Sequence, residues 1–187
     1  EIIKGAASAL YGASALGGVI NLVSRRPTEA ERELLVNSTS QSGLDVTSWL
    51  AHPIGTTASW TLLGGYHRQP RSDLDDDGWL DLPAFDRVVL RPRAFVDDGK
   101  GKTLFGTIGV MAEDRRGGTA RGAALSNGQP FPEELKSRHA DGGFVGRWLV
   151  QGNRVLAVRG SFMRRSQDRL FGTTREFGVR RTWFGEA

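Results

Sequence analysis

Alternation of apolar and polar residues is the feature that most constrains this chain. In the segment 87–96 the even positions are apolar, whereas Arg87, Arg91 and Arg93 stand at odd positions. A period of two is that of a β-strand with one apolar face. Pro92 removes one ladder donor, so we also expect a bulge there. The pattern predicts an all-β fold of about eight strands, over Leu34–Gln41, Leu44–Ala51, Ser59–His67, Arg87–Val96, Thr103–Glu113, His139–Gln151, Arg154–Arg165 and Thr174–Ala187.

The predicted connections alternate in length. After the first hairpin they run short, long, short, long, short and medium, and the long ones are Gln69–Phe85 and Asp114–Arg138. Short turns at one end and long loops at the other are typical of a transmembrane antiparallel β-barrel, whose lipid-facing residues are apolar and whose lumen-facing residues are polar. The predicted strands, of roughly ten residues, are long enough to span a bilayer when tilted. A soluble β-sandwich also alternates and remains the other interpretation.

Composition removes several function classes. The 187 residues include no cysteine, which excludes disulfides and thiolate metal sites, and no window of about eighteen apolar residues predicts a transmembrane helix. The net charge is +4, but the arginines follow strand alternation without an aromatic platform, so we expect no nucleic-acid binding. The three histidines lack metal-ligand spacing. We identify no Ser-His-Asp set and expect no enzymatic activity.

The first 27 residues differ from everything that follows. They carry no charge between Lys4 and Arg25 and are dominated by small residues. Glu1–Lys4 and Val19–Ser24 read as short strands, the second of them buried. A nucleotide-binding loop is excluded, because neither glycine-rich phosphate-binding motif is present.

This stretch resembles the end of the plug domain of TonB-dependent outer-membrane receptors. The residues that carry the resemblance are Ile2-Ile3-Lys4-Gly5, Ser8-Ala9-Leu10-Tyr11-Gly12, Gly17-Gly18-Val19-Ile20-Asn21-Leu22-Val23 and Arg26-Pro27. They cover about the first seventh of the chain. The family usually has proline where this chain has Ala6, and most often arginine in place of Lys4. The resemblance implies that Lys4, Gly5, Tyr11, Gly12, Gly17, Gly18 and Asn21 form the plug motif.

The resemblance implies a domain plan and a function. Residues 1–27 would end an α+β plug, 28–33 would be a linker, and 34–187 would be the first strands of a barrel of roughly 22. The signal peptide, the TonB box and the start of the plug would then precede Glu1, and most of the barrel would follow Ala187. The implied function is active uptake of a scarce ligand, commonly a ferric siderophore, across the bacterial outer membrane, driven by the TonB–ExbB–ExbD complex. A passive or enzymatic outer-membrane barrel and a soluble β-rich binding module remain alternatives.

Two loops contain candidate binding residues. The segment Asp73–Asp81 fits D-x-D-x-D-G-x-x-D, the first half of a calcium loop, and predicts Asp73, Asp75, Asp77 and Asp81 as ligands of Ca²⁺ on an outer loop. Ala84 replaces the glutamate expected at the twelfth position, and no cofactor is required by the implied function. Arg115, Arg116 and Arg121 predict a basic loop that contacts an anionic ferric siderophore or the phosphates of lipopolysaccharide.

Overall fold

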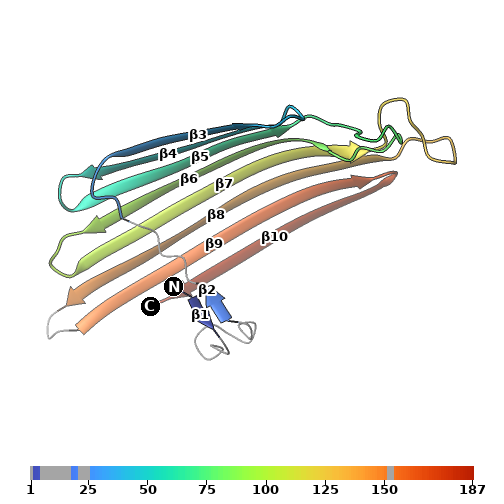
Figure 1. Cartoon of the computed structure of the whole chain (residues 1–187). Helices are drawn as coiled ribbons and strands as arrows, with labels where there is room; N and C mark the ends of the chain where they lie inside the picture. The colour runs from blue at the N-terminus through green and yellow to red at the C-terminus, as the bar shows by residue number, and fades with distance from the viewer. Residues whose placement is uncertain (1, 5–17, 21–25, 151–153) are drawn as a thin grey trace.

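The computed structural model is built almost entirely from one antiparallel sheet (Figure 1). The structure describes residues 2–4, 18–20, 26–150 and 154–187. Eight strands lie in sequence order, each paired with the next, which confirms the predicted all-β class and strand number. They are β3 (Glu31–Ser38), β4 (Leu44–Ile54), β5 (Ala58–Gln69), β6 (Ala84–Asp97), β7 (Lys102–Gly118), β8 (Pro132–Val150), β9 (Arg154–Phe171) and β10 (Thr174–Glu186). Within the described ranges, no helix is long and apolar enough to cross a membrane.

Several strands run further than their alternation predicts. The loop expected over Asp114–Arg138 is confined to 119–131, because β7 continues to Gly118 and β8 begins at Pro132. The medium loop expected over Ser166–Thr173 is wrong, since β9 extends to Phe171 and only 172–173 turn the chain. These extensions carry charge on both faces, as at the consecutive Arg115 and Arg116 of β7. Alternation therefore disappears there although the ladder continues.

The connections differ in length between the two ends of the sheet (Figure 1). One end carries 55–57 and 98–101, and the other carries 39–43, 70–83, 119–131 and 172–173. In the turn after β6 the amides of Lys102 and Lys100 donate to the carboxylate of Asp98, which lowers the pKa of Asp98. Both long loops thus lie at the same end, as expected, whereas 172–173 at that end is shorter than either turn described at the other.

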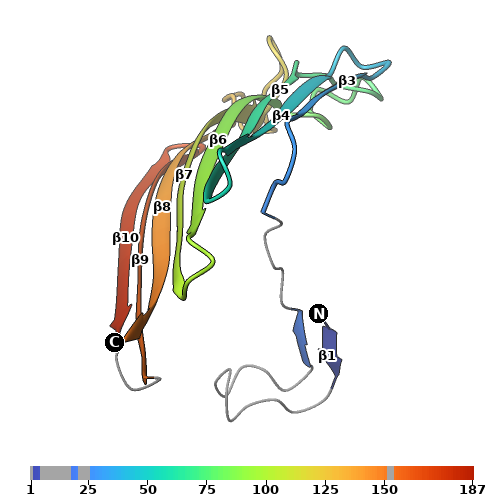
Figure 2. The same cartoon turned by 90° about the vertical axis from the view of Figure 1, so that its left-hand side faces the viewer.

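The sheet has one apolar and one polar face. Register places Leu62, Leu90, Val110 and Phe144 on the apolar face, whereas Arg87, Arg91, Arg93, Arg147 and Arg159 share the polar face as expected. The sheet is curved (Figure 2). Apart from glycines, the buried strand residues all lie on the polar face: Ala51, Ser59, Thr61, Phe95, Glu113 and Ser137. Because side chains converge on the inside of a curve, the polar face is the concave one.

Pro92 interrupts hydrogen bonding without a bulge. Leu90 pairs with Val110 and Arg93 with Thr107, so three positions on β6 match three on β7 and the register is unchanged. The two intervening pairs are missing, and the hydroxyl of Thr107 donates to the Pro92 carbonyl at 3.3 Å. The expected bulge is wrong because the missing N–H weakens the ladder but adds no residue to it.

Two short strands precede the sheet. β1 (Ile2–Lys4) pairs antiparallel with β2 (Gly18–Ile20), so that Lys4 lies opposite Gly18. The strand expected over Glu1–Lys4 is confirmed for its described residues, and β2 overlaps the strand expected over Val19–Ser24. The other predicted plug residues, Gly5, Tyr11, Gly12, Gly17 and Asn21, lie outside the described residues.

Candidate functional site

The two long loops meet at the loop end of the sheet. The amide of Leu80 donates to the Gly118 carbonyl at 2.9 Å, and the amide of Ala120 donates to the Gly78 carbonyl at 2.9 Å. The rings of Trp79 and Phe131 lie 5.9 Å apart. Loops 70–83 and 119–131 therefore form one surface, and the acidic candidates of loop 70–83 lie beside loop 119–131.

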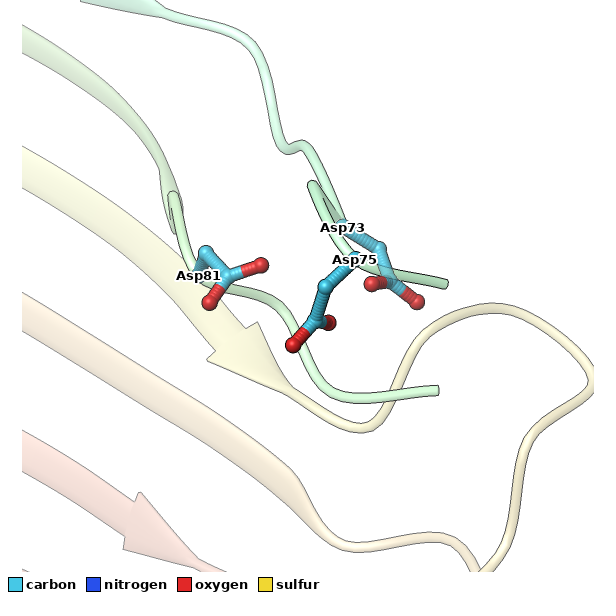
Figure 3. A group of neighbouring side chains, drawn as sticks. All are labelled: Asp73, Asp75 and Asp81. Atoms are coloured by element: carbon cyan, nitrogen blue, oxygen red, sulfur yellow. The ribbon is translucent and has the colours of Figure 1, made fainter. Parts of the chain in front are cut away.

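Three of the predicted calcium ligands come together. Asp73, Asp75 and Asp81 each offer a carboxylate oxygen within 4.8 Å of the other two (Figure 3). A backbone amide holds each carboxylate: Gly78 donates to Asp73 at 2.9 Å, Asp77 to Asp75 at 3.3 Å, and Leu74 to Asp81 at 2.8 Å. One oxygen of Asp73 is buried without a hydrogen-bond partner. The loop thus brings three carboxylates together and leaves a carboxylate oxygen of Asp73 free to coordinate a hard cation.

Asp77, the fourth predicted ligand, is not in this cluster. Its carboxylate accepts a hydrogen bond from the Trp79 amide at 2.7 Å, so it closes a turn of the loop instead. Ala84, at the position of the missing glutamate, is the first residue of β6. Ca²⁺ takes six to eight oxygen ligands, so three carboxylates fit it only in part. Calcium binding stays a prediction.

Two of the three basic candidates do not lie on a loop. Arg115 and Arg116 belong to β7, and only Arg121 lies within 119–131. Arg115 reaches Glu113 at 3.4 Å and stands 5.4 Å from the centre of the Phe85 ring. The prediction of a basic loop is therefore wrong for these two residues, because β7 extends through them. Arg115 is bound within the sheet.

Ion pairs on the polar face were not predicted. Both terminal nitrogens of Arg91 donate to Asp141 at 2.8 Å, and His139 contacts the same carboxylate at 3.0 Å. Glu113, only 6% exposed, binds Arg87 as well as Arg115. Alternation places each of these residues on the polar face, but pairing needs the register between strands. His139, expected to be without a metal role, serves here as a partner of Asp141.

No protein-family model matches the chain, and no solved structure matches it significantly.

Proposed function

We propose that this chain belongs to a TonB-dependent receptor of the bacterial outer membrane and forms part of its barrel wall and the end of its plug. The single observation that carries the proposal is the apolar band on the outer face, which crosses the strands obliquely. The sequence motif of the first 27 residues supports the plug and the family. The difference in loop length between the two ends of the sheet supports the barrel.

The apolar band is slanted relative to the rows of paired residues. On β3 the band begins at Leu34. The row of cross-strand partners of Leu34 passes through Ser48, Gly64, Leu90, Val110 and Ala140 and ends on β9 at Arg164. Arg164 lies outside the band, so the row leaves the band before it reaches β9. The band has an edge on the turn side, at Arg32 on β3 and at Arg154 on β9, and an edge on the loop side, at Ser38 on β3 and at Arg164 on β9. The row of Ser38 reaches Asp168, so the loop-side edge moves four residues along β9, in the same direction as the turn-side edge.

The slant has the size that a membrane requires. The row of cross-strand partners that begins at Arg32 ends on β9 at Phe162, whereas the turn-side edge of the band on β9 lies at Arg154. This edge therefore moves about eight residues along the strand over the roughly six strand spacings from β3 to β9. At about 3.3 Å per residue and 4.8 Å per strand, this displacement corresponds to a tilt of about 40°. Strands of membrane barrels tilt by about 35–45°. A horizontal bilayer would cover such a band, whereas a soluble sheet has no reason to keep an apolar band oblique to its rows of paired residues.

The polar, concave face would line the lumen. Several of its charges are paired, as with Arg91 and Asp141, which suits a wall against which a plug packs. The long loops would face outward and take the ligand, for which a ferric siderophore is the family's commonest choice. Because a pore wide enough for such a ligand would leak, the plug closes it. Transport then needs work from the TonB–ExbB–ExbD complex.

Growth tests this function. The full-length gene product should restore growth of a receptor-deficient strain under iron limitation with a supplied ferric siderophore, and should fail to do so without TonB. Rescue independent of TonB would support the passive barrel instead. Rescue by cobalamin or an oligosaccharide would contradict the iron assignment. Recovery of the protein in the soluble fraction would support the β-rich binding module and overturn the membrane proposal.

A further inference from the structure

Two arginines on the apolar face stand opposite each other without a counter-ion. Arg164 on β9 pairs with Arg181 on β10 in register, and both are exposed. Neither forms an ion pair within the described ranges. Two carboxylates of the same face nearer the loop end are already engaged, since Asp114 binds Arg138 at 2.8 Å and Asp168 binds Arg175. Like charges directly opposite on a sheet are destabilising, so this pair calls for an anion from outside the sheet.

A groove adjoins the arginine pair. It encloses about 760 Å³ on the apolar face, between the aromatic rings of Phe144, Phe162 and Trp183. Gly106 and Gly142 also line it: the space above Gly106 is open, whereas the Phe162 ring lies over Gly142, where a Cβ would come within 2.5 Å of it. The rings of Phe162 and Trp183 lie 5.8 Å apart. We call this the aromatic groove.

The two arginines lie next to the aromatic groove. Arg164 follows Phe162 by two positions on β9, and Arg181 precedes Trp183 by two on β10, so each cation stands about 7 Å along the strand from a ring of the groove. Both arginines lie on the loop side of the rings. The surface therefore presents two guanidinium groups at one end of an apolar channel.

We propose that this surface binds a membrane lipid with a phosphate headgroup. The two arginines take the phosphate, for which the guanidinium fork is well shaped, and an acyl chain occupies the aromatic groove. A small soluble anion would leave the groove empty, and an uncharged lipid would leave the arginines unpaired. The inference rests on the proposed membrane location and adds a specific partner to it.

Native mass spectrometry of the full-length protein released from neutral detergent can separate these occupants. Three probes are titrated: dioctanoyl phosphatidic acid, dioctanoylglycerol with the same chains and no phosphate, and glycerol 3-phosphate with no chains. We expect retained adducts with the phosphatidic acid at concentrations at least tenfold below those needed for either half. Glycerol 3-phosphate retained as tightly as the lipid would overturn the proposal in favour of a simple anion site.

Matched variants locate the site on the outer face. The double variant Arg164→Gln and Arg181→Gln should weaken phosphatidic acid binding at least tenfold. Arg165→Gln and Arg180→Gln change the adjacent register-paired arginines on the opposite face of the same strands, and should change it less than twofold. Equal losses in the two double variants, or none in the first, would overturn the proposal.

A second pair of variants tests the groove. A Cβ at Gly106 meets no atom within 4 Å, so Gly106→Leu directs a side chain into the groove, and Gly178→Leu makes the same change on the polar face at a position where a Cβ is equally unobstructed. Only the first should weaken phosphatidic acid binding. Unchanged phosphatidic acid binding by Gly106→Leu would show that the acyl chain does not occupy the aromatic groove. Extraction without detergent would instead refute the membrane location itself, so the two failures are distinguishable.

Discussion

Arg91 shows how a single residue supports the polar face. Its two bonds to Asp141 are charge-assisted and the carboxylate is only partly exposed, so Arg91→Gln should lower the free energy of unfolding by about 1.5–3 kcal/mol. Arg93 occupies the next position of the same face and strand and makes no ion pair within the described residues. Arg93→Gln should therefore cost less than about 0.5 kcal/mol. Urea unfolding in detergent micelles measures both, and equal losses would contradict the assigned role of Arg91.

Two glycines at the loop end make a second residue-scale comparison. Gly118 and Gly122 have the same positive φ of 89°, but a Cβ on Gly118 would lie 1.9 Å from the Phe131 carbonyl oxygen, whereas one on Gly122 meets nothing within 4 Å. Gly122→Ala should cost about 1–2 kcal/mol for its backbone conformation alone. Gly118→Ala should cost at least about 2 kcal/mol more, because the backbone at Phe131 must move. The midpoint of thermal unfolding ranks them, and an inverted order would show that β7 does not end as described.

At the scale of elements, loop 70–83 can be tested as a calcium loop. Asp81→Asn keeps an oxygen to accept the Leu74 amide but removes one charge from the cluster, so it should weaken Ca²⁺ binding at least tenfold in calorimetric titration. Asp76→Asn removes the same charge from a residue outside the cluster and should change affinity less than twofold. No measurable Ca²⁺ binding by the unaltered protein, or equal effects of the two variants, would show that the loop is only an acidic turn.

The sequence predicts the elements well where one face is apolar and poorly where neither is. Strands crossing the apolar band were found near their true positions, because burial of one face enforces a period of two. The end of β7 was missed, since Arg115 and Arg116 follow each other without an apolar residue between them. Their ladder continues because backbone pairing, not burial, holds it. Likewise Asp77 matches the calcium pattern in sequence, but a local hydrogen bond to Trp79 takes its carboxylate.

At the scale of the whole molecule, the sequence predicts two faces but not their geometry. Alternation alone assigns Leu34 and Arg164 to the same face. Only the register shows that they share a row and that the apolar band leaves this row between them. Register depends on long-range pairing, which a single sequence does not encode locally. The tilt, the ion pairs of the polar face and the aromatic groove all follow from it.

A spin-label scan tests most directly whether the apolar face of the sheet contacts lipid along an oblique band. Because the chain has no cysteine, single cysteines can be placed at successive positions of β7 from Leu104 to Ala112, and at Leu34 and Arg164, in the full-length protein in lipid vesicles. Accessibility to oxygen and to a water-soluble nickel chelate is then measured by electron paramagnetic resonance.

We predict high oxygen accessibility at every even position of β7 and low accessibility at the odd ones, with a period of two. Leu34 should be accessible to oxygen, and Arg164, in the same row, to the nickel chelate. Nickel accessibility at the even positions would contradict the membrane-spanning sheet. Equal depths at Leu34 and Arg164 would contradict its tilt.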